Sequence, residues 1–267
     1  MLNTSDVNTA DYEQFVQKVM SKTGIDLHSY KQQQMQRRLT TLRQRRGYGT
    51  FVDYFHAMAH NTKIMDEFLD QMTINFSEFF RNPEKWQVLK NRVLPQITSR
   101  KRSIRCWSAA CSTGEEPYTL AMILSEINNF TFDIQATDID QQALNRAVRA
   151  VYSKNAIQQV PKYLAQRFLE RTSTGEYQVS EAIKKKTAFS KHNLLADPYK
   201  KGFDLIICRN VLIYFKDDAK EQIIHKFSQS LEVGGYLFVG GTDYIRDQEV
   251  FGLETTPDMF FYRKAGK

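Results

Sequence analysis

The sequence predicts an α/β protein in which a doubly wound sheet follows an all-α segment. Two observations carry this prediction. Apolar residues recur at helical spacing through residues 11–85, and from Ser103 onward short runs of β-forming residues alternate with helical patterns. Repeated β-α-β units of this kind favour a mostly parallel sheet with helices on both faces. The length of 267 residues suits one large domain or two modest ones.

The N-terminal part is expected to form a small helical domain over residues 1–75. Asp11 is expected to cap the first helix. In the second helix, Met35, Leu39 and Leu42 fall at positions i, i+4 and i+7 and form one apolar stripe. The helices are predicted over about 11–24, 29–46, 51–60 and 63–72.

The α/β domain is expected over residues 103–267, after a linker over residues 76–102. The run at 203–208 is almost fully apolar, as strands in a parallel sheet are. The turn Gly234-Gly235 is expected to lead into the fourth strand. The strands are predicted in IRCWSA (104–109), FDIQAT (132–137), FDLIICRN (203–210), YLFVGG (236–241) and FFYRK (260–264). The helices are predicted from Pro117, over about 141–150 and over 218–231.

Residues 151–192 interrupt this alternation of strands and helices. Ser173-Thr174-Gly175 indicates a turn, and short β-like pieces around 177–179 and 187–189 flank it. We therefore expect a small β insertion with a hairpin, at about 165–192.

The composition argues against several classes of protein. The three cysteines are odd in number and none has CxxC spacing, which argues against a disulfide framework, and Cys111 is expected to be a small buried thiol. The five histidines show no HExxH-like spacing, so no metal site is expected. The N-terminus lacks a signal-peptide pattern, and no run approaches the roughly 18–20 apolar residues of a membrane span. We expect a cytoplasmic protein without membrane insertion.

The net charge of +7 is concentrated in places. Residues 27–52 contain no Asp or Glu, and the predicted second helix there is rich in arginine. This basic helix is either a solvated face or a docking surface for an acidic partner, and nucleic acid would also be attracted. No nucleic-acid-binding motif is visible, so no nucleic-acid partner is expected. The arginines of this helix are Arg37, Arg38, Arg43, Arg45 and Arg46.

Candidate ligand-binding residues follow three of the predicted strands. CWSAACSTGEE (106–116) joins a strand to a helix N-terminus, whose N–H groups suit ligand binding, although one glycine also fits an ordinary tight turn. Asp138 ends the next strand, where an acid in a doubly wound fold accepts hydrogen bonds from a ribose. The alternative is a helix cap, which Asp140 supplies equally. Arg209 and Asn210 end the third strand, where the alternative is an arginine paired with a helix carboxylate. Both NAD and S-adenosylmethionine (SAM) carry the ribose that this pattern predicts.

Several ordered motifs resemble one family, the chemotaxis receptor protein-glutamate O-methyltransferases of the CheR type. The resemblance covers nearly the whole chain and implies an all-α N-terminal domain followed by a Rossmann-like SAM-dependent methyltransferase domain with a small β insertion. The motifs are NFSEFFR (75–81), SAACSTGEEPY (108–118), TDID (137–140), NLL (193–195) and CRNVLIYF (208–215).

The resemblance also implies roles for individual residues. Arg81 and Tyr214 would be catalytic and hold the acceptor carboxylate, and Arg81 would also contact the cofactor. Glu116, with Glu115 second, would bind the amino group of SAM, and Asp138 would bind its ribose. The remaining cofactor-binding residues would be Asn75 and Ser77 (where a Thr is common in the family), Asn193 and Leu194 beside the adenine, and Arg209 and Asn210 near the methyl group.

The implied reaction transfers the methyl group of SAM to glutamate side chains of methyl-accepting chemotaxis receptors, with S-adenosylhomocysteine as the other product. The basic helix would dock the acidic methylation helices of the receptor. The predicted hairpin looks short, so we expect no use of a pentapeptide tether at the receptor C-terminus. The alternatives are a SAM-dependent nucleic-acid methyltransferase, and a SAM-binding sensor without activity. Transfer to a carboxylate fits the residues because such an acceptor is already an anion at neutral pH.

Overall fold

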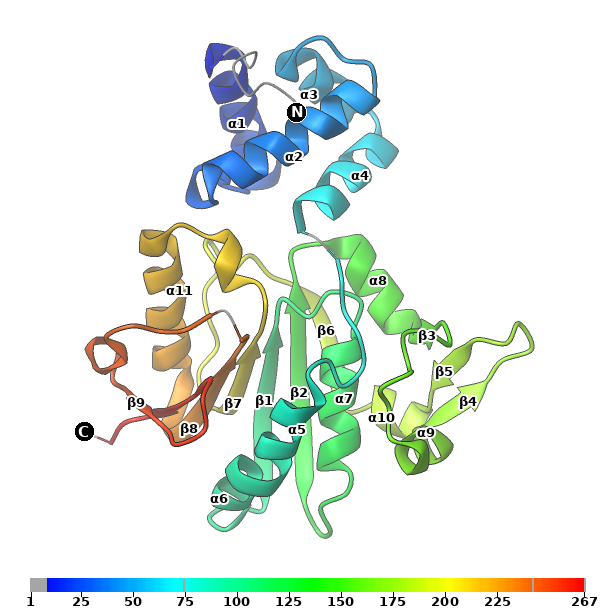
Figure 1. Ribbon diagram of the computed structural model, residues 1–267, viewed down its shortest axis with the longest axis vertical. Coiled ribbons are helices and arrows are strands. Elements are labelled where there is room, and N and C mark those ends of the chain that lie inside the picture. Colours follow the sequence, from blue (N-terminus) through cyan, green and yellow to red (C-terminus); the bar gives the residue numbers. More distant parts are fainter. Residues whose placement is uncertain (1–8, 74, 242, 267) are drawn as a thin grey trace. The chain divides into compact units, whose positions relative to one another are not determined.

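A computed structural model of the chain describes residues 9–73, 75–241 and 243–266 (Figure 1). Residues 1–8 and 74 of the predicted helical domain therefore lie outside the described residues. Contacts between residues divide the chain into two compact units. The first unit comprises residues 1–75 and 214–221, and the second comprises 76–213 and 222–267.

The first unit is helical, and each of the four predicted helices is present. Aromatic residues fill its core, where the Phe15 ring contacts the rings of Phe51 and Phe68. The stripe of Met35, Leu39 and Leu42 is buried, as its spacing predicted. The elements are α1 (Thr9–Thr23), the 3₁₀ turn η2 (Leu27–Ser29), α2 (Gln32–Arg45), α3 (Phe51–His60) and α4 (Thr62–Thr73).

Asp11 does not cap its own helix, which corrects the sequence-based expectation. It lies inside the first turn of α1, and its two carboxylate oxygens accept hydrogen bonds from the backbone N–H groups of Phe51 (2.7 Å) and Val52 (3.0 Å). These groups belong to the first turn of α3, where N–H groups lack partners within the helix. Asp11 therefore joins α1 to α3 across 40 residues of sequence.

The second unit is built on a seven-stranded sheet in the order β6-β2-β1-β7-β8-β10-β9. The first five strands in this order are parallel, and the last two are antiparallel to their neighbours. The sheet is therefore mixed, and its parallel part carries the motifs that follow β1, β2, β6 and β7. The strands are β1 (Ser103–Ala109), β2 (Thr131–Asp138), β6 (Thr187–Lys191), β7 (Phe203–Cys208), β8 (Leu231–Val239), β9 (Leu253–Thr255) and β10 (Phe261–Lys264).

The helices of the second unit pack on this sheet. In Figure 1, α5, α6 and α7 lie in front of β1 and β2. Residues 83–98 form one continuous helical stretch, whose Trp86, Leu89 and Val93 are buried in the same core as Ile104 of β1. The helical elements of this unit are α5 (Pro83–Val88), a π-helical turn η3 (Leu89–Val93), α6 (Leu94–Thr98), α7 (Glu115–Leu124), α8 (Gln141–Arg149) and η5 (Gln248–Phe251). Two further elements, η4 (Leu212–Tyr214) and α11 (Asp217–Ser230), contain residues of both units.

Two strands differ from the sequence-based expectation. Thr187–Phe189, expected in the insertion, belongs to β6, which pairs in parallel with β2 of the large sheet. The expected turn at Gly234-Gly235 is instead an irregularity inside β8, because the strand begins at Leu231 and its register against β7 shifts there. A Cβ on Gly235 would lie 2.9 Å from the Glu232 carbonyl oxygen, so glycine permits this close approach of the backbone.

The expected β insertion with a hairpin is present as a separate three-stranded sheet. Its strand order is β3-β5-β4, and the hairpin joins β4 to β5 through a turn at Gly175. The elements are β3 (Val151–Tyr152), α9 (Lys162–Phe168), β4 (Leu169–Arg171), β5 (Tyr177–Val179) and α10 (Glu181–Lys184). Across the described parts of the chain, no helix combines the length and the apolar character that a membrane span requires.

We predict that Asp11→Ala lowers the free energy of unfolding by about 1–2 kcal/mol, the usual cost of losing a side-chain cap. The substitution leaves two N–H groups of α3 without their acceptor. Urea unfolding followed by far-ultraviolet circular dichroism measures the change. Gln14→Ala, at an exposed position on the same helix, is the matched control and should change stability by less than about 0.5 kcal/mol. Equal stability of the two variants would contradict the capping role.

Candidate functional site

The loop between β1 and α7 is tightly bent. Ala110, Ser112 and Gly114 all have positive φ angles, of 59°, 50° and 94°. Non-glycine residues hold this conformation only where the surroundings fix it. Here the N–H of Ser112 donates to the Asp138 carboxylate at 2.7 Å. A Cβ on Gly114 would lie 2.8 Å from that of Ala147 in α8, so the one glycine of this loop is required for close packing of two elements.

Asp138 lies at the carboxyl end of β2 and is only 6% exposed. Its oxygens accept hydrogen bonds from the N–H groups of Ser112 and Asp140 (2.9 Å). Burial raises the pKa of Asp138 to about 6, although these hydrogen bonds oppose the shift. Asp140 caps α8 by accepting from the N–H groups of Gln142 and Ala143. Asp140, and not Asp138, is therefore the N-cap of α8, and Asp138 lies at the end of β2.

Two acids begin α7, of which Glu115 is buried and Glu116 is partly buried, with 13% of its side chain exposed. Glu116 accepts a hydrogen bond from the Ser108 hydroxyl (2.8 Å), and Glu115 accepts one from the Thr113 hydroxyl (2.7 Å). Burial raises the pKa of both carboxyl groups, and an interaction of Ser77 with Glu115 opposes the pKa shift of Glu115. Each of these acids is therefore costly to ionise without a further positive or hydrogen-donating partner.

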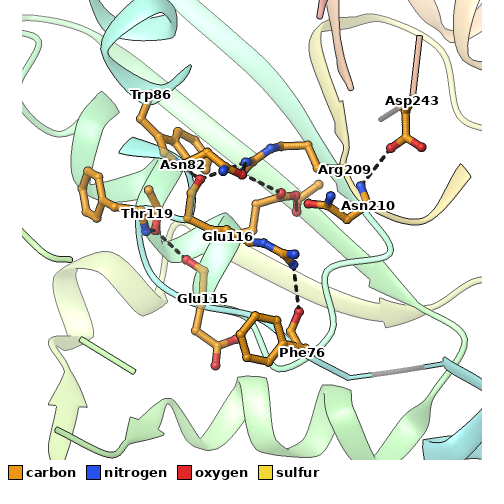
Figure 2. A network of polar contacts seen from close by, with 12 residues as sticks. Phe76, Asn82, Trp86, Glu115, Glu116, Thr119, Arg209, Asn210 and Asp243 are labelled. Atoms are coloured by element: carbon orange, nitrogen blue, oxygen red, sulfur yellow. Dashed lines mark hydrogen bonds and ion pairs between the residues drawn. The ribbon is translucent and has the colours of Figure 1, made fainter. Parts of the chain in front are cut away.

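Arg209, at the end of β7, connects Glu116 to the segment that follows Phe76 (Figure 2). Its Nη2 donates to the Arg81 carbonyl (2.8 Å) and to the Asn82 Oδ1 (2.9 Å), and its Nη1 lies 3.7 Å from a Glu116 carboxylate oxygen. Burial lowers the pKa of Arg209, and Glu116 opposes this shift. The sequence left open whether Arg209 contacts a ligand or pairs with a helix carboxylate, and the structure shows the carboxylate contact.

The guanidinium of Arg209 is enclosed by aromatic faces as well. It lies 5.4 Å from the ring centre of Trp86 and 5.0 Å from that of Phe238. The Trp86 indole in turn donates to the Arg81 carbonyl (3.1 Å). The buried Nε of Arg209 has no hydrogen-bond partner among the described residues.

Asp243 is a site residue that the sequence reasoning missed. It is fully buried, and its Oδ2 accepts a hydrogen bond from the N–H of Asn210 (2.9 Å), as Figure 2 shows. Asn210 has a positive φ of 59°, and a Cβ on Gly240 would lie 2.6 Å from its nitrogen. One signal was available, because Asp243 is an acid that comes shortly after the end of β8 at Val239. Thr119 was also missed. Its hydroxyl accepts a hydrogen bond from the N–H of Phe80 (3.0 Å) and donates one to the carbonyl of Glu115 (2.8 Å).

The predicted residues of the NFSEFFR motif divide between the units. Arg81 lies in the second unit, where its Nη1 donates to the Phe76 carbonyl (3.3 Å) and its guanidinium lies over the Phe76 ring. Ser77 contacts Glu115 in the same unit. Asn75 is grouped with the first unit and donates to the Asp70 carboxylate (3.2 Å).

Asn193 and Leu194 follow β6, the strand next to β2. The N–H of His192 donates to the carbonyl of Asp138 (2.9 Å), which joins this segment to the β2 strand end. The Asn193 side chain accepts from the N–H of Leu195, and Leu194 is buried. The structure therefore brings Asn193 and Leu194 to the same sheet edge as Asp138, because β6 belongs to the large sheet.

The five arginines of the basic helix have different environments within the first unit. Arg37, Arg45 and Arg46 are all exposed. Arg45 and Arg46 form ion pairs with Glu67, at 2.7 Å and 2.5 Å. Arg43 is only 9% exposed, lies over the Phe51 ring and donates to the Gly49 carbonyl. Because Arg43 is buried within the helical unit, the expectation that it docks a partner is corrected.

Arg38 and Tyr214 contact each other in the first unit. The guanidinium of Arg38 lies 5.7 Å from the ring centre of Tyr214. Burial lowers the pKa of Arg38, and Tyr214 opposes the shift. Arg37 and Arg38 also line a hollow of about 370 Å³, together with Gln34, Thr41, Leu42, Arg45 and Gln71.

Among the residues that the structure describes, no metal-binding cluster is found and the Cys111 thiol is buried. Among residues 9–73, 75–241 and 243–266, no group of three or more His, Cys, Asp or Glu is arranged to hold a metal ion. Cys111 is buried, as expected, and burial raises the pKa of its thiol. A thiol of this kind is inert rather than nucleophilic.

Comparison with known proteins agrees with this architecture. The family model of the CheR methyltransferase SAM-binding domain matches residues 75–260, and that of the CheR methyltransferase all-alpha domain matches residues 10–73. A chemotaxis protein methyltransferase of Listeria monocytogenes is 40% identical over 256 residues, which cover 95% of this chain and 97% of the relative. The protein of the same name in Borreliella burgdorferi is 34% identical, with 90% of each chain covered.

The fold and the site define a SAM-dependent methyltransferase with an all-α N-terminal domain. More particularly, the chain belongs to the CheR family of chemotaxis protein methyltransferases. Its cofactor is SAM. The described residues fit this cofactor, since buried acids suit its amino group and ribose, and the Arg209 Nε offers a buried donor.

We predict that affinity for S-adenosylhomocysteine weakens as the pH falls through about 6. If Asp138 binds the ribose, its ionised carboxylate would accept hydrogen bonds from the ribose hydroxyls, and the protonated carboxyl would lose acceptor capacity. With a pKa of about 6, the dissociation constant should rise about tenfold between about pH 7.5 and about pH 5. Isothermal titration calorimetry measures it. Asp138→Asn, which does not titrate, should bind more weakly and show a smaller change with pH. A wild-type affinity that is equal at both pH values would contradict the role of Asp138.

Proposed function

We propose that this enzyme transfers the methyl group of SAM to glutamate side-chain carboxylates of methyl-accepting chemotaxis receptors, giving methyl esters and S-adenosylhomocysteine. One observation carries the proposal. Relatives named chemotaxis protein methyltransferases match along nearly the whole chain, through both the all-α and the SAM-binding domains. The similarity therefore extends beyond the cofactor-binding fold to the domain that carries the basic helix.

In this proposal, acids at the strand ends bind the polar groups of the cofactor. Glu116 binds the amino group, with Glu115 as a second acid beside it. Asp138 binds the ribose. The raised pKa values of these three groups support the assignment, because a positive or hydrogen-donating ligand favours their ionised forms.

Further residues complete the proposed cofactor site. Asn193 and Leu194 flank the adenine, and their place beside the β2 strand end supports this. Asn75, Ser77 and Arg81 bind the cofactor from the NFSEFFR motif. The side chains of Arg209 and Asn210 would line the cofactor near its methyl group. The buried Arg209 Nε, which has no described partner, supports a ligand contact by Arg209 in addition to its contact with Glu116.

The proposed chemistry requires alignment more than proton transfer. SAM supplies an electrophilic methyl group on a sulfonium. A glutamate carboxylate, ionised at neutral pH, attacks this carbon, so that a C–O bond forms, the S–C bond breaks and its electron pair remains on sulfur. No proton moves, so no general base is needed. We assign Arg81 to hold the acceptor carboxylate by charge and Tyr214 to orient it by hydrogen bonding.

The basic helix α2 is proposed to dock the acidic methylation helices of the receptor. Its exposed arginines are Arg37, Arg45 and Arg46, and two of them share Glu67 within the unit. Arg37 therefore offers the least neutralised charge of the three. A surface of this kind accelerates encounter with an acidic partner and makes it sensitive to salt.

We predict base-labile methyl esters on the receptor when this enzyme, labelled SAM and receptor-containing membranes are mixed. Alkali should release the label as methanol. Arg81→Ala should lower kcat about 100-fold, because the acceptor loses its alignment, whereas Arg102→Ala, at an exposed arginine outside the proposed site, should not. A label that resists alkali would contradict carboxyl methylation. Transfer to RNA or DNA at low salt, with none to receptor, would favour a nucleic-acid methyltransferase.

We also propose that this enzyme does not capture a tether at the receptor C-terminus. The β4 and β5 strands have only three residues each, which leaves a short edge for pairing with a peptide. A receptor without its C-terminal tail should therefore be methylated with kcat/KM within about twofold of the complete receptor. A tenfold or larger decrease would show that the tail is used.

A further inference from the structure

Arg38 differs from the exposed arginines of α2 because its guanidinium is anchored within the first unit. Its Nη1 donates to the carbonyl oxygens of Gln71 (3.3 Å) and Met72 (3.2 Å). Both carbonyls lie in the last turn of α4, where carbonyls lack partners within the helix and the helix dipole is negative. The anchor therefore holds the guanidinium at a defined place between α2 and the end of α4.

The anchored guanidinium contacts the ring of Tyr214, 5.7 Å from its centre. A cation over an aromatic face is attracted by the ring, and the attraction strengthens where water is partly excluded. Arg38 is partly buried, and burial lowers its pKa. Its side chain therefore contacts two α4 carbonyls and one aromatic ring at once.

The backbone of Tyr214 is held by other residues. Its carbonyl accepts a hydrogen bond from the N–H of Lys31 (2.8 Å), and the next residue, Phe215, pairs with Tyr30 in an antiparallel bridge. The N–H of Lys216 donates to the Ser29 carbonyl (2.9 Å). The main chain at Tyr214 is thus fixed without Arg38, and what Arg38 adds is the direction of the ring.

We infer that Arg38 is a positioning residue for Tyr214 and not a docking residue for the receptor. The inference rests on the proposed role of Tyr214 in orienting the acceptor carboxylate. In this arrangement α2 has two functions. Arg37 and its exposed neighbours attract the acidic partner, while Arg38 directs the tyrosine hydroxyl that receives the acceptor.

The chemistry of the anchor requires arginine. A guanidinium is a planar group with several N–H donors, so it donates to two carbonyls while its face lies against a ring. A lysine ammonium keeps the charge but lacks this flat shape. Arg38→Lys therefore separates the two roles, since a docking residue needs mainly charge and a positioning residue needs the guanidinium geometry.

The test combines steady-state kinetics with a double-mutant cycle. Methylation of receptor membranes is measured for wild type, Arg38→Lys, Arg38→Ala, Tyr214→Phe and the double variants. We expect Arg38→Lys and Arg38→Ala to lower kcat about ten- to 100-fold with KM changed less than about twofold. In the Tyr214→Phe background, the same changes should lower kcat less than about twofold, because Arg38 acts through the tyrosine.

Two controls on the same helix define the comparison. Gln33→Ala, at an exposed position outside the hollow, should retain the wild-type kcat and KM. Arg37→Ala should raise KM for the receptor at low salt, with a smaller effect at high salt. The positioning role is overturned if Arg38 behaves like Arg37. In that case Arg38→Ala would raise KM in a salt-dependent way, Arg38→Lys would restore the wild-type KM, and the effect on KM would persist in the Tyr214→Phe background.

A second measurement does not depend on turnover. In protein with ¹³C-labelled tyrosine, the ring signal missing from Tyr214→Phe identifies Tyr214. This signal should shift in Arg38→Lys, while signals of tyrosines in the second unit stay in place and show that the fold is intact. An unchanged Tyr214 signal would overturn the inference even if receptor methylation is found. A wild-type enzyme that makes no receptor ester would overturn the proposed function alone.

Discussion

The buried guanidinium of Arg209 makes the contacts on which the arrangement of the candidate site depends. Removing a charge from water costs several kcal/mol, so it must be surrounded by acceptors. The chain supplies them from the Arg81 carbonyl, the Asn82 side chain and Glu116, while Trp86 and Phe238 enclose its faces. The end of β7, the 81–82 segment and the first turn of α7 are therefore held in one arrangement, since moving any of them leaves a buried charge without its partner.

The buried acid at the end of β2 shows what the candidate site costs in stability. A carboxyl pKa raised from 3.8 to about 6, as at Asp138, corresponds to roughly 3 kcal/mol against ionisation in the folded protein. This cost is present above about pH 6 and is relieved as the pH falls towards 4, because the folded state then binds the proton more tightly than the unfolded chain. Shifted acids gathered at the carboxyl ends of strands are typical of ligand sites, and the CheR family match identifies the ligand as SAM.

The first unit shows that charge in a sequence does not identify a docking surface by itself. Five arginines lie between positions 37 and 46, in α2 and directly after its end, yet their surroundings differ. Arg43 is buried over Phe51, Arg45 and Arg46 pair with Glu67, and Arg38 is anchored to α4 and contacts Tyr214. The exposed Arg37 fits the simple picture of a basic face, and the neighbouring Arg38 connects the same helix to the proposed acceptor site.

The sequence by itself determined the class of fold, the four N-terminal helices, the strands at the motifs and the strand-end residues Asp138, Arg209 and Asn210. These follow from periodicity and local propensity, which are encoded in neighbouring residues. Tertiary structure alone decided that Asp11 caps α3, that β6 joins the large sheet, that Asp243 holds Asn210 and that Arg43 is buried. Each of these depends on contacts between residues about 6 to 50 positions apart, and such contacts leave no periodic signal in the sequence.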